Sequence, residues 1–384
     1  MDLSIDIFTI LNIIGVFQGF FAVFLFLFAN KKNKKANIIL AILFLIITIS
    51  ISYGIIYFTK LYKYFPHLIR ISQPFQLLIA PMFYFYVKFL TIQNYSFKKF
   101  DFLHFLPFIA FVIILIPFYL QDGMTKIKFI ETIYHDGNKI LLPIIIWIIV
   151  LCYSVFYIVL IKNILKDYKK QIVNNFSNIK SINLNWLNYA INIFLIMNIC
   201  FFIIGLLKLM IFQNFNWEKI IPLIATVGIF SLTYKAFILP EIYTNIEDDN
   251  KDINEQKYNK SLLKTENIEY NAKKILEYIE KEKPYLDPDL SLVSLSEQIN
   301  ISRNDLSQII NTYFNKNFYD FINSYRIEEF KRILLNPEND KFTILSLAFE
   351  SGFNSKSTFN DVFKKMTNQT PSQFKKETKI YPKG

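Results

Sequence analysis

The chain has 384 residues, of which 53% are hydrophobic, and it contains 41 phenylalanines but only 9 glycines. This composition excludes an average soluble domain and indicates a membrane protein. The net charge of +11 is uneven, because residues 1–240 carry 21 basic and 8 acidic groups whereas residues 261–384 carry 18 and 17. The positive charge therefore reflects membrane topology and does not indicate a broad phosphate-binding surface.

Apolar segments long enough to cross a bilayer, about 20 helical residues each, recur through the first 240 residues. The third is the least regular, because Arg70, Gln73 and Pro74 interrupt it before the run from Leu77 to Val87. The predicted fold class is all-α, with a seven-helix transmembrane bundle followed by a cytoplasmic helical domain. The transmembrane domain covers residues 1–240, with spans expected at about 7–29, 37–58, 68–90, 102–120, 140–161, 186–210 and 220–239.

The charges of the first loop predict the orientation, since short cytoplasmic loops carry more Lys and Arg than external loops. Residues 31–35 include four lysines directly after the first span, whereas Asp2 and Asp6 precede it. This pattern places the N-terminus outside, and an odd number of spans then delivers the C-terminus to the cytoplasm. We expect a multi-pass protein of the inner, cytoplasmic membrane, followed at residues 241–265 by an acidic cytoplasmic linker without a core.

Residues 1–240 contain few side chains that could act in catalysis or bind a metal or a ligand. Cys152, Cys200 and the three histidines lack metal-ligand spacing, so no metal and no cofactor are expected. No paired acid and base appears within the spans, so no catalytic residue and no enzyme activity are expected. The candidates for binding an unknown ligand are Asn188 and Asn192 in the sixth span and Arg70 and Gln73 in the third, although span amides more often form interhelical hydrogen bonds.

Residues 266–384 contain two helix-turn-helix patterns, the first at about 292–313. Leu292, Leu295 and Ile299 repeat at helical spacing after Ser291, the expected N-cap residue. After a turn at Asn300, Ser302 begins a second helix, in which Leu306, Ile309, Ile310 and Tyr313 are expected to face inward. The outer face of this helix carries side chains that can form hydrogen bonds with the base edges and phosphates of DNA. These are Arg303, Asn304, Ser307, Gln308 and Asn311.

The second pattern, at about 344–366, follows a connecting helix expected at 318–335. Thr343 caps a short helix, Gly352 supplies a tight turn, and Ser355 caps the next helix. Phe359, Phe363 and Met366 are expected to pack inward. The outward residues of this helix are Lys356, Ser357, Asn360 and Lys364.

The segments "LSEQINISRNDLSQIIN", "NFYDFINSYRIEEFKRILL" and "ILSLAFESGFNSKSTFNDVFKKMTNQTPSQFKK" resemble the AraC-type regulators over about residues 266–384. The resemblance implies two three-helix subdomains, joined by the helix around Tyr325 and Arg326. It also implies that two recognition helices enter successive major grooves about 34 Å apart. The base-facing candidates it implies are Asn304, Ser307 and Gln308, with Lys356, Ser357 and Asn360.

Three positions depart from the pattern of these regulators. Asp361 stands where a basic residue is frequent, which weakens the attraction for phosphate, and Asn315 and Asn368 replace turn glycines. Because residues 261–384 carry a net charge of only +1, we expect one copy to bind weakly and tight binding to need a homodimer. The expected partners are double-stranded DNA, the lipid bilayer, a second copy, and an unknown signal molecule or partner membrane protein.

Taken together, these features predict a membrane-anchored, sequence-specific DNA-binding transcriptional regulator that senses a signal through its spans. The alternative is a multi-span transporter or membrane receptor whose DNA-binding domain is released by proteolysis in the linker. A transporter is expected to show broken helices or an internal repeat near mid-membrane. Pro74 and Pro81 are the sequence features that favour it, but a carrier would not explain the DNA-binding pattern.

Overall fold

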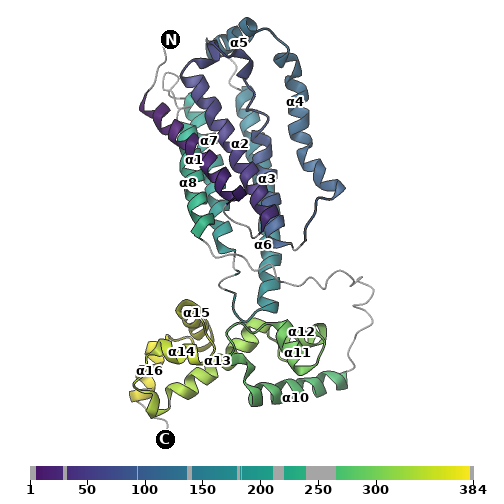
Figure 1. Cartoon of the computed structure of the whole chain (residues 1–384), viewed down its shortest axis with the longest axis vertical. Helices are drawn as coiled ribbons and strands as arrows, with labels where there is room; N and C mark the ends of the chain where they lie inside the picture. The colour runs from purple at the N-terminus through teal and green to yellow at the C-terminus, as the bar shows by residue number, and fades with distance from the viewer. Residues whose placement is uncertain are drawn as a thin grey trace. The chain divides into compact units, whose positions relative to one another are not determined.

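The computed structural model describes residues 6–28, 33–92, 94–135, 141–179, 182, 184–210, 220–238 and 265–380. These residues form α-helices and short 3-10 turns, so the expected all-α fold class is confirmed. The chain divides into two compact units (Figure 1). Unit 1 comprises Met1–Lys166 and Leu184–Thr244, and unit 2 comprises Asp167–Asn183 and Asn245–Gly384. The expected linker, except for Thr265, lies outside the described residues.

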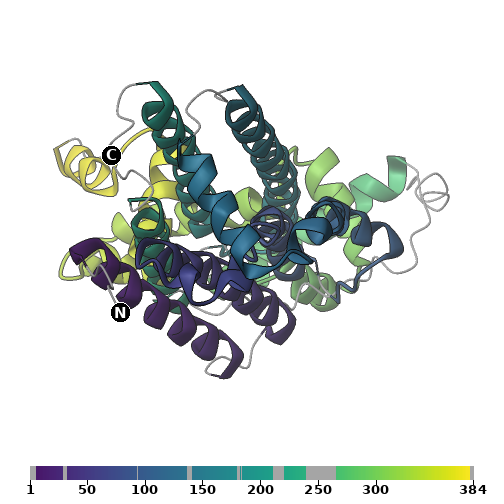
Figure 2. The same cartoon turned by 90° about the horizontal axis from the view of Figure 1, so that it is seen from above.

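Unit 1 is built from apolar helices. Helices α1 and α2 lie side by side, and α2 also packs against α3 and α8 (Figures 1 and 2). Small residues permit this approach, since Gly19 of α1 faces Thr48 of α2 and Gly15 faces Thr226 of α8. The helices are α1 (Ile7–Phe28), α2 (Lys34–Phe58), α3 (Gln76–Thr91), α4 (Leu106–Tyr119), α5 (Gly123–His135), α6 (Leu141–Asn175, which ends in unit 2), α7 (Asn185–Met210) and α8 (Ile220–Ile238).

Five helical stretches of the described chain are long and apolar enough to cross a membrane: Ile7–Phe28, Lys34–Phe58, Lys99–Tyr119, Ile144–Asn175 and Trp186–Leu207. Two shorter apolar helices, Gln76–Thr91 and Pro222–Tyr234, coincide largely with the third and seventh expected spans. Large apolar side chains cover the outside, as at Phe17 of α1, which is 73% exposed. Such an exposed apolar surface suggests that these helices lie in a membrane, because contact of apolar side chains with water is unfavourable.

Unit 1 differs from the sequence expectation at three places. Helix α3 begins at Gln76 instead of about residue 68, because Arg70 has a φ of 65° and residues 69–75 form turns. Helix α5 was not expected, since Gly123–His135 is too polar for a span. Helix α6 continues to Asn175, well past the expected end near residue 161, because no Gly or Pro follows Pro143 to break it.

Unit 2 contains two separate hydrophobic cores joined by one helix. The first lies among α10, α11, α12 and the start of α13, around Leu295, Leu306 and Phe321. The second lies among the end of α13, α14 and α15, around Phe330, Leu347 and Phe363. The helices are α10 (Thr265–Glu282), α11 (Leu292–Ile299), α12 (Arg303–Thr312), α13 (Phe318–Leu334), α14 (Ile344–Glu350), α15 (Lys356–Thr367) and α16 (Pro371–Ile380).

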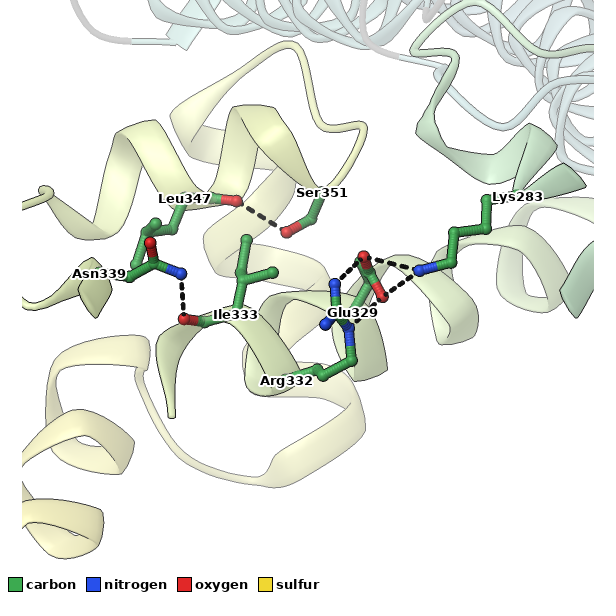
Figure 3. Close-up of polar contacts among 7 residues, drawn as sticks. All are labelled: Lys283, Glu329, Arg332, Ile333, Asn339, Leu347 and Ser351. Carbon is green, nitrogen blue, oxygen red and sulfur yellow. Dashed lines mark hydrogen bonds and ion pairs between the residues drawn. The ribbon is translucent and has the colours of Figure 1, made fainter. Parts of the chain in front are cut away.

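A cluster of ion pairs joins α13 to the residue that follows α10, as Figure 3 shows. The Glu329 carboxylate accepts hydrogen bonds from Nε and Nη2 of Arg332, at 2.9 and 2.7 Å, and from Nζ of Lys283 at 3.2 Å. Lys283 follows α10, so this carboxylate links the end of α10 to the connecting helix α13. Nearby, Asn339 Nδ2 donates to the carbonyl oxygen of Ile333 and closes the end of α13 (Figure 3).

The Glu329 cluster predicts a dependence of stability on pH. Hydrogen bonds from Arg332 and Lys283 lower the pKa of the Glu329 carboxyl. The ionised Glu329 carboxylate therefore contributes fully to the free energy of unfolding above the ordinary Glu pKa of about 4.3. This contribution is lost as the pH falls through the lower pKa of the folded state. We expect Glu329→Gln to cost about 1 kcal/mol at pH 7 and much less at low pH. Hydrogen exchange of the α13 amides at both pH values measures this; an equal cost at both would contradict it.

Candidate nucleic-acid interface

The first candidate surface is the outer face of α12. Ser302 caps the helix, since its hydroxyl accepts a hydrogen bond from the backbone N–H of Asp305 at 3.1 Å. Leu306, Ile309 and Ile310 are buried in the first core, as the spacing predicted. Tyr313 is an exception: it is 48% exposed, because α12 ends at Thr312 and the chain turns before the ring reaches the core.

The five candidate residues of α12 share one face but differ in exposure. Asn304 and Asn311 are exposed, whereas Arg303, Ser307 and Gln308 are half-buried. Asn311 Nδ2 lies 3.4 Å from Ser307 Oγ, one helical turn away. Nη2 of Arg303 donates to Oδ1 of Asn175 at 3.0 Å. The face therefore presents amide, hydroxyl and guanidinium groups together, which is the mixture that reads base edges and contacts phosphates.

The second candidate surface is the outer face of α15. Ser355 caps this helix through the backbone N–H of Thr358, and Phe359, Val362 and Phe363 are buried beneath it. The four outward residues are all exposed: Lys356, Ser357, Asn360 and Lys364. Met366 is half-buried and packs against the second core, in agreement with the sequence pattern. Lys356 and Asn360 also border a shallow hollow with Ile344 and Pro371.

The turns between these helices use residues that adopt left-handed backbone conformations. Asn300, which ends α11, has a φ of 54°, and Asn368, which ends α15, has a φ of 58°. Asn315 also has a positive φ, of 49°, so Asn315 and Asn368 both occupy left-handed turns, which asparagine tolerates better than most residues. Gly352, between α14 and α15, has a φ of 91° and is enclosed by the backbone of Tyr285 and Leu286.

Arg326 of α13 lies between the two cores and is only 1% exposed. Its Nε donates to the carbonyl oxygen of Tyr285 at 2.7 Å and its Nη2 to that of Asp287 at 2.6 Å. Burial lowers the pKa of Arg326 to about 10, so it stays charged at neutral pH. The sequence signal for this burial is its spacing, since Arg326 lies four residues after Ile322 and four before Phe330 on the same helical face.

The candidate ligand residues of unit 1 do not gather at one site. Asn188 and Asn192 are exposed on α7, whereas Asn198 of the same helix accepts a hydrogen bond from Ser154 of α6 at 2.9 Å. Nε of Arg70 donates to Gln73 Oε1 at 2.7 Å, and the guanidinium lies over the ring of Phe118 at 5.3 Å. Among the described residues, no group of three or more His, Cys, Asp or Glu side chains is placed to hold a metal ion.

Comparison with known proteins also identifies a helix-turn-helix domain in the region of α12 and α15. Residues 295–377 match the model of a helix-turn-helix domain family. An uncharacterized HTH-type transcriptional regulator of Staphylococcus aureus (strain COL) is 32% identical over 117 residues, which are 30% of this chain and 14% of that protein. An uncharacterized HTH-type transcriptional regulator in the cgkA 5′ region of Pseudoalteromonas carrageenovora is 35% identical over 88 residues, 23% of this chain and 50% of that protein.

The chain thus spans half or less of the length of these two relatives. No solved structure matches it significantly. The matched region contains both candidate helices, α12 and α15, and the connecting helix between them. The C-terminal part of the chain therefore contains a helix-turn-helix DNA-binding domain similar to those of HTH-type transcriptional regulators.

Proposed function

We propose that this chain is a membrane-anchored, sequence-specific transcriptional regulator that binds promoters from the inner face of the cytoplasmic membrane as a dimer. Unit 1 anchors it and senses a signal molecule or a partner membrane protein. A signal acts by binding one packing of the helices better than another, and this difference biases the DNA-binding unit.

The observation that carries the proposal is the pairing of α12 and α15 within one unit. Each helix buries its apolar face in a separate core and presents amides, hydroxyls and basic groups outward. A single helix, α13, contributes to both cores, so it fixes the spacing between the two outer faces. Two recognition helices held by one connector can follow one face of a duplex through successive major grooves.

Exchange of single outward residues tests the DNA-binding face. In mobility-shift titrations of the full-length protein in nanodiscs, we expect Asn304→Ala and Lys356→Ala each to weaken binding by about 1 to 3 kcal/mol. Base preference should also relax at one operator position for each variant. Lys281→Ala is the charge-matched control, because Lys281 is exposed on α10, outside both candidate helices. Unchanged affinity and preference in both variants would refute this face.

The low net charge of the DNA-binding region leads to an expectation about dimerisation. We expect affinity to fall steeply with salt and to depend on protein concentration, because a dimer doubles the number of phosphate contacts. Removing one phosphate contact with Lys364→Ala should reduce the salt slope by about two for a dimer, one for each copy. Tight binding by a monomer that is insensitive to salt would contradict the dimer.

The proposed orientation has its own test. Protease added to the outside of spheroplasts should leave residues 265–380 intact, and detergent should make them accessible. The support for this orientation is the lysine cluster at 31–35, which follows α1 and precedes most of α2. Digestion of the C-terminal unit in intact spheroplasts would place the DNA-binding domain outside and end the proposal.

A further inference from the structure

The segment between α6 and α7 belongs to the DNA-binding unit although its sequence neighbours are apolar helices. Residues Asp167–Asn183 group with unit 2, and they include the last turns of α6. Tyr168 Oη donates to the carbonyl oxygen of Ile182 at 2.9 Å, so this hydrogen bond closes the segment on itself. Tyr168, Ile172 and Ile182 are all buried. We call residues 167–183 the docking segment.

Ser177 is the anchor of the docking segment and is 0% exposed. Its backbone N–H and its hydroxyl both donate to the carbonyl oxygen of Leu290, at 3.2 and 2.6 Å. The neighbouring Phe176 forms an antiparallel β-bridge with Ser291, the N-cap residue of α11. The segment therefore pairs backbone to backbone with the residues that enter the first helix-turn-helix.

The connecting helix α13 provides the other hydrogen-bond partners of Ser177. The Ser177 carbonyl oxygen accepts hydrogen bonds from Asn323 Nδ2 at 3.0 Å and from Arg326 Nη1 at 3.3 Å. The Ser177 hydroxyl oxygen also accepts from Arg326 Nη2 at 3.1 Å. Asn323 and Arg326 are both almost wholly buried. Buried N–H donors need hydrogen-bond acceptors, and Ser177 of the docking segment supplies some of the acceptors for Asn323 and Arg326.

The docking segment also reaches the candidate DNA surface. Oδ1 of Asn175, the last residue of α6, accepts the hydrogen bond from Nη2 of Arg303. Arg303 is the first residue of α12, and the N-terminal residues of a recognition helix are those that meet the DNA. A duplex in contact with this end of α12 needs the space and the guanidinium that the end of α6 occupies. Docking and complete DNA engagement therefore compete.

We propose that residues 167–183 are an intramolecular docking segment: Ser177 holds the segment against Asn323 and Arg326, and Asn175 then withholds Arg303 from DNA. The inference rests on the proposed function, because it concerns how the same DNA surface is controlled. Since the segment is joined directly to α6 and α7, movement of these two helices can pull Ser177 from its seat. Release would free the N-terminal end of α12 and strengthen DNA binding.

A reversible cross-link tests the competition. Paired residues of an antiparallel bridge have Cα atoms about 4.5–5.5 Å apart, within the range of about 4.4–6.8 Å that disulfides accept. The full-length protein would carry Phe176→Cys and Ser291→Cys with Cys152→Ala and Cys200→Ala, in nanodiscs. We expect oxidation to join the two positions and to weaken DNA binding about tenfold, the size of one charge-assisted hydrogen bond. Reduction should restore binding.

The oxidised and reduced forms carry the same substitutions and differ only in the disulfide, so a folding defect caused by the substitutions affects both forms. Failure of the cross-link to form, or equal affinity of the two forms, would overturn the docking proposal while leaving the DNA-binding function intact. If the wild-type chain itself bound no DNA, the proposed function would fail and the competition with it. The protein without the two introduced cysteines controls for direct effects of the oxidant.

A second variant releases the segment without a cross-link. Ser177→Lys places a cation against the buried Arg326 guanidinium, so the segment should leave its seat and DNA binding should strengthen about tenfold. Gln171→Lys adds the same charge to the same segment at an exposed position and should leave affinity unchanged. Weaker or unchanged binding by Ser177→Lys would show that docking supports DNA engagement or has no effect on it, and either result overturns the proposal.

Discussion

Replacing Gly352 with alanine is expected to destabilise unit 2 by about 3 kcal/mol or more, because alanine combines a strained backbone with a steric clash here. Gly352 has a φ of 91°, which an L-residue with a Cβ rarely adopts. The added Cβ would collide with the carbonyl oxygen of Tyr285 and lie 2.9 Å from Leu286 Cα. Both are backbone atoms and cannot rotate away as a side chain would.

Hydrogen exchange of the full-length protein measures this loss locally, since amide protection in α14 and α15 reports the opening of the second core. Asn354→Ala, two residues further along the same turn, is the control, because Asn354 is exposed and its change should be close to neutral. If Gly352→Ala kept wild-type protection in both helices, the turn would not have the backbone conformation described above.

Arg326→Met is expected to have the second large effect, again about 3 kcal/mol or more, because each buried acceptor left without a donor costs about 1–3 kcal/mol. Methionine keeps the length of the side chain but removes every N–H group. The carbonyl oxygens of Tyr285 and Asp287 would lose the guanidinium that binds them at 2.7 and 2.6 Å. Ser177 would lose two of its hydrogen bonds as well.

The matched control is Arg332→Met on the same helix. The Arg332 side chain is 64% exposed and bonds to Glu329, so its loss should cost well under the amount expected for Arg326. Amide hydrogen exchange that becomes faster in α11 and α13 for Arg326→Met, and not for Arg332→Met, would show that the buried hydrogen bonds of Arg326 stabilise unit 2. Equal effects of the two substitutions would mean that the charge of α13 matters and the fit of the guanidinium does not.

The DNA-binding unit was largely predictable because its signals are local. Ser291, Ser302, Thr343 and Ser355 each precede a helix and cap it as expected, since capping depends on the next three residues alone. The outward faces of α12 and α15 followed from the spacing of the apolar residues. Tyr313 failed this rule because periodicity does not locate the last residue of a helix.

The contacts that depend on distant residues were not predictable. Arg326 donates hydrogen bonds to the carbonyl oxygens of residues 285 and 287 and to Ser177, and no local sequence pattern joins these segments. The place of residues 167–183 in unit 2 was missed for the same reason, since hydropathy assigns them to a loop between spans. In unit 1, the left-handed backbone of Arg70 delays the start of α3, a conformation that composition does not reveal.

Chromatin immunoprecipitation with sequencing, performed on the full-length protein in its own cells, is the decisive measurement of DNA recognition. We expect a small set of promoter sites shared by wild type and Lys281→Ala, with strong loss of enrichment when Asn304→Ala and Lys356→Ala are combined. The bound protein should also remain full-length on blots of the membrane fraction. Enrichment that is absent in wild type, or that survives the double substitution, would contradict DNA recognition by the faces of α12 and α15.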